Sequence, residues 1–272
     1  MSHHHLVQKA APPLRIDARA LQPAFAAALS ADELRRVALP LGRDTIALGE
    51  LFDVQAGAET ETPTLTIEGD LSRFDALGLG LAEGTLDLRG PVGDSVGQGQ
   101  SGGRITVQGD AGDLAGCSLR GGWLEVHGHV GDLAASALPG DMDGMRGGTF
   151  IVHGNAGERL ADRMRRGTIV VHGDVGELVA SRMVAGTLAI AGRCGANPAW
   201  GMRRGSLVFA GPAPALPATF VPLVSDASVF WQLLARHLAR FGGAFAGLAA
   251  RRVQRHAGDL AVLGKGELLL PC

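Results

Sequence analysis

The chain has 272 residues, a formal net charge of −2 and 46% hydrophobic residues. The near-neutral charge gives no basis for nucleic-acid binding, and the hydrophobic content is sufficient for a large buried core. No apolar run approaches about 18 residues, and the N-terminal MSHHHLVQKA lacks the hydrophobic core of a signal peptide, so we expect a soluble cytoplasmic protein. The three cysteines have no metal or redox spacing, which agrees with reduced thiols in a cytosol.

The first element expected along the chain is a short helix near residue 30. Ser30 followed by Glu33 is the pattern of a capping box, and Leu34, Val37 and Ala38 would form the apolar face of the helix. This helix and the run LPLGRDTIALGELFDV precede the repeats described next. We therefore interpret residues 1–63 as an N-terminal capping segment.

The middle of the chain repeats itself with a period of 19 residues. GTFIVHGNAGERLADRMRRG (148–167) is followed at once by GTIVVHGDVGELVASRMVAG (167–186). One glycine after each strand-like run marks the repeat: Gly90, Gly109, Gly128, Gly154, Gly173, Gly192 and Gly211. The single step of 26 residues comes from an insertion around ALPGDMD (137–143), which we expect to loop outward. A fixed period near 20 residues predicts a solenoid.

Each repeat contains one strand whose second and fourth residues are apolar. These pairs are Leu86/Leu88, Ile105/Val107, Leu124/Val126, Phe150/Val152, Ile169/Val171, Leu188/Ile190 and Leu207/Phe209. Period-2 alternation points both members of a pair into a common core. The predicted class is all-β: a right-handed parallel β-helix of about seven 19-residue coils over residues 64–211, with helical caps at both ends.

Residues 212–272 are interpreted as a C-terminal capping helix and strand. The run FWQLLARHLARF (230–241) predicts a helix. Its expected apolar face comprises Phe230, Leu233, Leu234, His237, Leu238 and Phe241. An open β-helix has unpaired strand edges that promote aggregation unless they are covered, so we expect both flanks to act as caps.

Equivalent positions of successive coils place like side chains in columns. His127, His153 and His172 form one column, but ligands spaced along a line by roughly 4.8 Å suit zinc poorly, because zinc ligands converge on one point. An acidic column recurs in five coils, which favours a structural corner over a catalytic pair. Its members are Asp94, Asp113, Asp132, Glu158 and Glu177. The sequence therefore predicts no catalytic, cofactor-binding or metal residue in this chain.

An arginine column is the strongest candidate for binding. Its members are Arg120, Arg146, Arg165, Arg166, Arg203 and Arg204, and the last five of these are the expected contact residues. Aligned guanidinium groups make a positive stripe that can hold carboxylates or phosphates through bidentate contacts. Pairing with nearby acids, or simple solvation of the corner, is the alternative.

The outward third position of each strand changes from polar to apolar along the stack. Asp87, Thr106 and Glu125 give way to Ile151, Val170, Ala189 and Val208. A contiguous outward apolar surface must be covered. We expect another protein of an assembly to cover Ile151, Val170 and Val208, with the C-terminal helix of the chain itself as the alternative.

Three runs of the sequence together resemble the C subunits of the formylmethanofuran dehydrogenase family. They are LSADELRRVALPLGRDTIALGELFDV, the G-x-x-G repeats and AGDLAVLGKGELLL, and the resemblance extends from about residue 14 to residue 270. The Ala- and Arg-rich, Tyr-free composition favours the bacterial version, which is the C subunit of the formyltransferase/hydrolase complex. The repeats alone are also similar to the C-terminal β-helix domain of glutamate synthase large subunits.

The resemblance implies a non-catalytic scaffold component of an enzyme complex in one-carbon metabolism, on the route from formaldehyde to formate. Such complexes move one-carbon units between tetrahydromethanopterin and a methanofuran-type carrier. The implied partners are the A, B and D subunits, of which A is amidohydrolase-like and D is formyltransferase-like, with any metals in those partners. The arginine column could guide the polyglutamate chain of the carrier.

Three alternatives stay open from the sequence. The chain could be the C subunit of a molybdenum or tungsten formylmethanofuran dehydrogenase, because that chemistry would reside in other chains. It could be an independent β-helix enzyme, although the inner six-residue period of hexapeptide acyltransferases is absent. It could also be a spacer domain like that of glutamate synthase.

Overall fold

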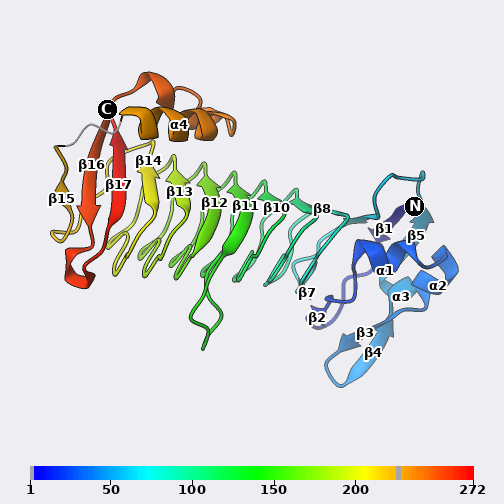
Figure 1. Ribbon diagram of the computed structural model, residues 1–272. Coiled ribbons are helices and arrows are strands. Elements are labelled where there is room, and N and C mark those ends of the chain that lie inside the picture. The colour runs from blue at the N-terminus through cyan, green and yellow to red at the C-terminus, as the bar shows by residue number, and fades with distance from the viewer. Residues whose placement is uncertain (1–2, 225–227) are drawn as a thin grey trace.

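The computed structural model describes residues 3–224 and 228–272. Most of the regular structure is strand, and one 13-stranded, mostly parallel sheet runs through the molecule (Figure 1). Its strand order is β15-β16-β17-β14-β13-β12-β11-β10-β9-β8-β6-β1-β5. Helices are short and few, and they lie towards the two ends of the stack. No helix in the described ranges is both long enough and apolar enough to cross a bilayer.

The N-terminal part places short helices and hairpins beside the first strands of the sheet. Its elements are β1 (His3–Gln8), β2 (Ile16–Asp17), α1 (Pro23–Ala27), α2 (Ala31–Arg35), β3 (Ala38–Leu41), β4 (Asp44–Ala47), α3 (Leu48–Leu51) and β5 (Phe52–Ala56). The expected capping box is confirmed, since the Ser30 side chain accepts from the Glu33 backbone N–H while Glu33 reaches back to Ser30. The helix is shorter than expected: α2 ends at Arg35, and Ala38 is an exposed residue of β3.

The repeats contribute a run of strands that pair in parallel and in a constant register. They are β6 (Thr64–Glu68), β8 (Thr85–Arg89), β9 (Arg104–Val107), β10 (Trp123–Val126), β11 (Arg146–Val152), β12 (Arg166–Val171), β13 (Thr187–Ile190) and β14 (Ser206–Phe209). Leu86 pairs with Ile105, and Leu124 pairs with Phe150, so equivalent residues of successive repeats lie side by side. The seven predicted inward pairs, from Leu86/Leu88 in β8 to Leu207/Phe209 in β14, are all fully or almost fully buried. The predicted inward alternation is therefore confirmed.

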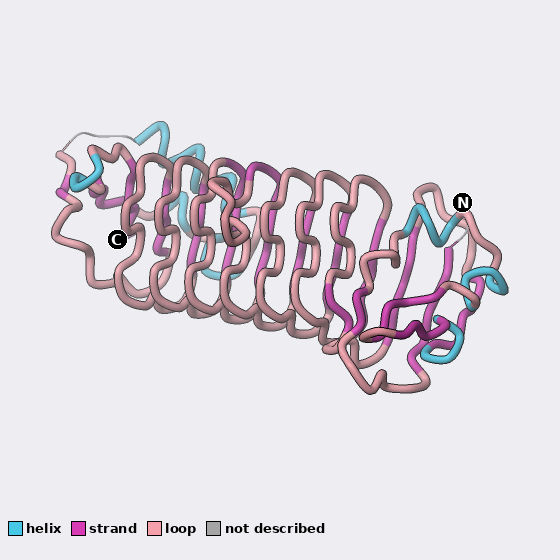
Figure 2. The backbone as a smooth tube through the Cα atoms, turned by 90° about the horizontal axis from the view of Figure 1, so that it is seen from below, coloured by secondary structure: helices cyan, strands magenta, loops and turns pink. Residues whose placement is uncertain are grey.

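A second column of backbone contacts lies in the loops between these strands. Isolated parallel bridges run from Leu71–Val92 to Val175–Cys194, one for each successive pair of repeats. Figure 2 shows the loops of successive repeats stacked in the same way as the strands. The stack is tight at its glycines: a Cβ built on Gly90, whose φ is +146°, would lie 1.9 Å from the carbonyl oxygen of Gly69. A side chain at this position would break the stacking of the two coils.

The insertion at 137–143 projects away from the sheet between β10 and β11, as expected (Figure 1). The strands on its two sides still pair in register, from Trp123–Thr149 to Val126–Val152. The insertion therefore changes the surface without disturbing the order of the strands.

The C-terminal part returns to the sheet and also covers its outer face. Its elements are β15 (Val221–Pro222), α4 (Ser228–Ala239), η1 (Gly243–Phe245), η2 (Leu248–Ala250), β16 (Val253–Gly258), η3 (Leu260–Val262) and β17 (Gly266–Pro271). β17 pairs in parallel with β14, and β16 pairs antiparallel with β17. The sheet therefore gains strands from the C-terminal segment beyond the last repeat. A short pair, β2 with β7 (Phe74–Asp75), lies near the other end.

The apolar outer face of the repeats is covered by the chain itself, which corrects the expectation that another protein covers it. Val170 and Val208 are 0% exposed and form a second core with α4 and the turns that follow it. The remaining members of this core are Ala189, Ala210, Trp231, Ala235, Leu238, Phe245, Leu248 and Leu269. Ile151 is also buried, so none of the three residues presents a free apolar surface.

The face of α4 that packs on the sheet also differs from the expected one. Leu238 is buried and Leu234 and Phe241 pack against the second core, as expected. Trp231 and Ala235 are buried in addition, whereas Phe230 and Leu233 are 42% and 64% exposed. The helix carries apolar residues on more than one side, so periodicity alone did not decide which side meets the sheet. In the observed orientation the indole N–H of Trp231 donates a hydrogen bond to the Arg251 carbonyl oxygen at 2.7 Å.

Candidate functional site

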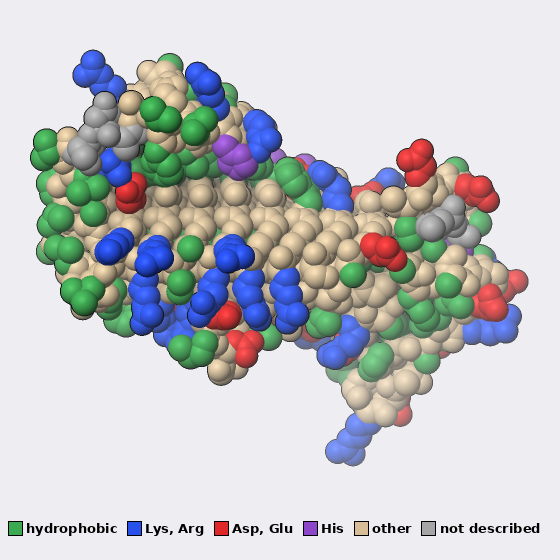
Figure 3. Space-filling model, viewed as in Figure 1, with side chains coloured by type: hydrophobic (Ala, Val, Ile, Leu, Met, Phe, Trp, Pro, Cys, Tyr) green, Lys and Arg blue, Asp and Glu red, His purple; other side chains and the backbone are tan. Residues whose placement is uncertain are grey.

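The five arginines predicted from the repeat positions lie together on one side of the stack. We call Arg146, Arg165, Arg166, Arg203 and Arg204 the arginine edge. With Val184 and Ala185 they line an open cavity of about 520 Å³. Figure 3 shows basic side chains gathered on this side of the molecule, next to the projecting insertion.

The repeat itself aligns these arginines. They follow inward-pointing methionines, since Met145, Met164 and Met202 are fully buried. Backbone bonds then hold the next residue against the preceding repeat, as in Arg165 N–H to Met145 O at 2.7 Å. Arg146 and Arg166 are direct partners across β11 and β12. The guanidinium groups therefore project from equivalent corners of successive repeats.

The arginine edge carries a clear excess of positive charge. Arg165 hydrogen-bonds to Asp143 of the insertion, and Arg146 lies 3.9 Å from the same carboxylate. Within residues 3–224 and 228–272, no acidic side chain forms an ion pair with Arg166, Arg203 or Arg204. The edge can therefore accept further carboxylate or phosphate groups.

A second cavity, of about 380 Å³, adjoins the arginine edge and was not found from the sequence. Arg165 and Arg203 line both cavities, and Trp200, which is 57% exposed, lines this one. Beside it, Asp162 is buried and accepts hydrogen bonds from Ser181 and from two nitrogens of Arg182. The sequence signal was weak here, because Trp200 lies outside the strand pattern and occurs in one repeat only.

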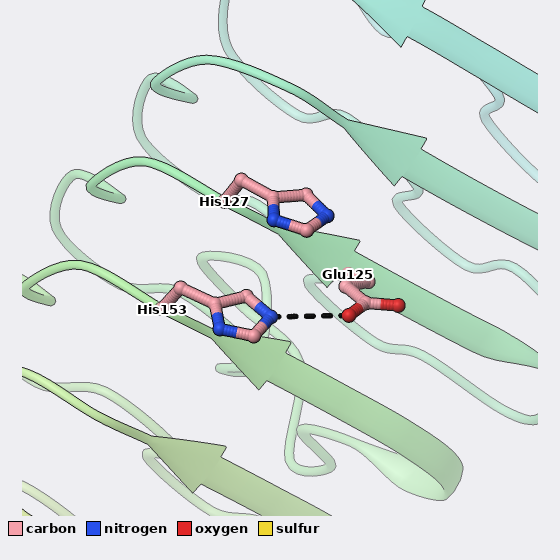
Figure 4. Close-up of side chains that lie close together, drawn as sticks. All are labelled: Glu125, His127 and His153. Carbon is pink, nitrogen blue, oxygen red and sulfur yellow. Dashed lines mark hydrogen bonds and ion pairs between the residues drawn. The ribbon is translucent and has the colours of Figure 1, made fainter. Parts of the chain in front are cut away.

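The histidine column forms a stack on the outer face of the sheet. The ring centroids are 4.6 Å apart for His127 and His153 and 5.0 Å apart for His153 and His172. Glu125 lies beside this stack, with its Oε1 3.0 Å from Nε2 of His153 (Figure 4). One candidate ligand atom from each of Glu125, His127 and His153 lies within 4.8 Å of the others. We call these three residues the histidine cluster.

The histidine cluster was not predicted from the sequence, because the histidine column was considered without its neighbours. Glu125 lies in β10, and His127 follows directly after the end of this strand. Residues two apart in extended backbone point to the same face of the sheet, so both side chains lie on one side. The next strand, β11, then brings His153 beside them. The available signal was Glu-x-His in one repeat followed by His at the equivalent place in the next.

The surroundings of the cluster favour the charged form of Glu125 and disfavour protonation of His172 and His237, which lie nearby. Burial alone would raise the pKa of Glu125, but hydrogen bonds from Trp123 and His153 and the charge of Arg104 hold that pKa below its ordinary value. Burial, reinforced by the neighbouring His153, lowers the pKa of His172. Burial and the charge of Arg240 lower the pKa of His237.

A cavity of about 340 Å³ lies beside Glu125 and His153 of the histidine cluster, between the sheet and the end of α4. It is lined by Trp123, Glu125, Thr149, Ile151, His153, His237, Arg240 and Phe241. Ile151, expected at a contact with another protein, is instead part of this internal wall. The cavity combines aromatic walls with carboxylate and imidazole groups.

Comparison with known proteins identifies the family. The GXGXG motif family matches residues 64–219. A chain in the crystal structure of the formyltransferase/hydrolase complex (FhcABCD) from Methylorubrum extorquens, in complex with methylofuran, is similar with a TM-score of 0.89 and 37% identity over 98% of this chain and 99% of that one. The C subunit of the Fhc complex of the same organism is 47% identical over 53 residues. The chain belongs to the family of Fhc C subunits.

The two Methylorubrum similarities differ in extent. The stretch shared with the curated Fhc C subunit spans 20% of each sequence, whereas the structural similarity takes in both flanks of the repeats. The resemblance to the C subunits, which rested on the flanking runs and the repeats, is therefore confirmed, and so is the bacterial version, which the composition favoured. Membership of this family also agrees with the G-x-x-G repeats, which lie within the matched motif region.

Proposed function

We propose that this chain is the non-catalytic scaffold component, the C subunit, of a formyltransferase/hydrolase complex. The observation that carries the proposal is the structural match over 98% of the chain at 37% identity to a chain of such a complex. The complex would act in methanofuran- and tetrahydromethanopterin-linked oxidation of formaldehyde to formate, in the cytoplasm. The match to a hydrolase complex supports this function over a molybdenum or tungsten dehydrogenase, an independent β-helix enzyme and a glutamate-synthase-like spacer.

The proposed partners are the formyltransferase-like D, the amidohydrolase-like A and the B subunits of the same complex. In this arrangement the catalytic groups and any catalytic metals belong to the partners, and this chain holds them in fixed relative positions. The methylofuran in the related complex supports a methanofuran-type carrier here as well. Tetrahydromethanopterin would be the second one-carbon carrier, bound by the formyltransferase-like partner.

We also propose that the stack is a right-handed parallel β-helix of about seven coils over residues 64–211, with capping segments at 1–63 and 212–272. The constant register of the parallel strands and the second column of bridges support this architecture. The family match over residues 64–219 supports the limits of the middle domain. Such a rod suits a scaffold, because each coil presents its surface residues at a fixed spacing.

Within this function, the arginine edge is the proposed contact for the polyglutamate chain of the carrier. A polyglutamate offers one carboxylate per residue, and the edge offers several guanidinium groups in a row, of which Arg165 pairs with Asp143. Bidentate pairing of guanidinium with carboxylate gives such a contact both strength and direction. Arg166, Arg203 and Arg204 are available for it without breaking an ion pair with a described residue.

The polyglutamate contact is tested by charge reversal. Binding of a γ-linked polyglutamate peptide to the full chain should weaken about tenfold or more in the double variant R165E/R203E, which corresponds to at least ~1.4 kcal/mol. The matched control R36E/R43E makes the same change of charge on exposed residues of the N-terminal part. Equal affinity of both double variants would remove the contact from the proposal.

The scaffold role is tested by assembling the partner proteins with and without this chain. Formyl transfer and formyl hydrolysis, measured separately, should persist without it, while the coupled sequence should slow strongly. The physical reason is that a carrier held by its polyglutamate chain can reach both active sites only if the scaffold keeps these sites at a fixed distance from each other. A substitution in this chain that abolished one half-reaction in a fully assembled complex would contradict a purely structural role.

A further inference from the structure

The histidine cluster has the donor set of a zinc site. Two imidazoles and one carboxylate are a ligand combination that zinc uses in proteins, with a fourth position for water or substrate. The three ligand atoms of Glu125, His127 and His153 already lie within 4.8 Å of one another. Two adjacent strands of one rigid sheet position them, so their backbone positions are fixed by the core beneath.

From this geometry we propose that Glu125, His127 and His153 bind one divalent metal ion of the zinc type. The site lies on the outer face of the sheet beside β10 and β11, away from the arginine edge. It depends on this chain's own residues alone and is independent of the proposed assembly.

The carboxylate of Glu125 is held in a suitable position. Its Oε2 accepts hydrogen bonds from Arg104 at 2.8 Å and from the indole N–H of Trp123 at 2.9 Å. These contacts leave Oε1 directed at His153, 3.0 Å away, where the ion would enter between the two groups. Hydrogen bonds to the far oxygen of a metal-binding carboxylate are the usual way in which proteins orient such a ligand.

The two imidazoles must turn out of their stack to meet one ion, because their planes are only 6° from parallel and their nitrogen lone pairs lie in those planes. Zinc–nitrogen bonds of about 2.1 Å in a tetrahedral arrangement bring two ligand nitrogens to roughly 3.4 Å from each other. The stacked rings are 4.6 Å apart at their centroids, and both side chains are on the exposed side of the sheet. Among the described residues none hydrogen-bonds to a ring nitrogen of His127. The His127 ring can therefore turn without losing a hydrogen bond, whereas the His153 ring would exchange its stacking on His127 and His172 for the bond to the ion.

The fourth position of the ion would face the cavity under the end of α4. His237 and Arg240 line the same cavity as Glu125 and His153. Water, or His237 itself, would complete a tetrahedron on this side. The bound ion would also tie β10 to β11 at the point where the insertion separates the two repeats in sequence.

The test is zinc titration of the chelator-treated full chain, with cobalt as a spectroscopic probe of the same site. Wild type should bind one zinc ion at this site, and the cobalt form should show the visible absorption of a tetrahedral site. The double variant H127Q/H153Q should lower the zinc affinity at least tenfold and remove that absorption. E125Q, which keeps the shape and removes the anionic ligand, should weaken binding as well.

The control must account for the other histidines near the surface. His3 and His5 lie near one another on β1, where their rings contact Thr66 and Glu68, and they could bind metal independently. The matched control H3Q/H5Q should keep the zinc affinity and the cobalt absorption of wild type. Circular dichroism of each variant verifies folding. Absence of zinc binding in wild type, binding that survives both H127Q/H153Q and E125Q, or binding lost only in H3Q/H5Q would each overturn the proposal.

Discussion

His172 is the least exposed member of the histidine column, and its surroundings make its protonation unfavourable. Its ring stacks on His153 and meets the edge of Phe245, with centroids 5.2 Å apart. Burial first, and the neighbouring His153 second, lower its pKa below the ordinary value of 6.5. The folded protein therefore binds a proton at this site more weakly than the unfolded chain does.

This difference predicts a loss of stability in mild acid. The contribution of His172 is fully present above the unfolded pKa of about 6.5 and is lost as the pH falls from there through the lower folded pKa. In H172Q, which cannot titrate, the free energy of unfolding should depend less steeply on pH between about 6.5 and 5. Urea unfolding at several pH values measures the slope, and an unchanged slope in H172Q would contradict the assignment.

Asp162 provides a second prediction for a single residue. Its side chain is only 7% exposed and accepts hydrogen bonds from Ser181 and Arg182. D162A leaves these donors without their acceptor, so the free energy of unfolding should fall by roughly 1.5–3 kcal/mol. Asp143, which pairs with Arg165 and Arg146 at the surface, is the matched control, and D143A should cost less than about 1 kcal/mol. If urea unfolding showed equal losses of unfolding free energy in D162A and D143A, the burial of Asp162 would not contribute to stability.

Among the elements, α4 decides whether the outer face of the last repeats is exposed. It covers Val170 and Val208 through Trp231 and Leu238, and its opposite side carries Leu233 in solvent. W231A should destabilise the packing of α4 by roughly 3–5 kcal/mol, because a large buried ring is removed. L233A should change it by less than about 0.5 kcal/mol.

Hydrogen exchange of the α4 amides distinguishes the two variants directly. Protection of α4 should collapse in W231A and persist in L233A. The reverse result would support the helix face expected from the sequence, on which Leu233 points inward.

Sequence patterns predicted the repeat strands because their causes are local. Alternation and the glycine period act within one repeat, so Leu124 and Phe150 could be placed in the core without knowing their neighbours. The orientation of α4 could not be predicted in this way, because it depends on the sheet face that the helix meets. The histidine cluster was missed for a related reason: its metal-like geometry arises only when Glu125 and His153 come together from different repeats.

At the scale of the whole molecule, the fold is an elongated stack with different chemistry on different sides (Figures 1 and 3). The arginine edge lies at the repeat corners, and α4 covers part of the outer strand face. The N-terminal helices and hairpins lie at one end of the stack, and the C-terminal strands extend the sheet at the other. Regular spacing of distinct surfaces along a stable core is what a scaffold requires, and the proposed function needs no catalytic group in the stack.

The most direct test of the scaffold function is gentle affinity purification of the chain from its own cells, followed by mass spectrometry of the proteins that elute with it. Stoichiometric recovery of formyltransferase-like and amidohydrolase-like chains in one assembly is the predicted result. Recovery of this chain alone, stable and folded, under conditions that preserve other complexes would contradict the scaffold function.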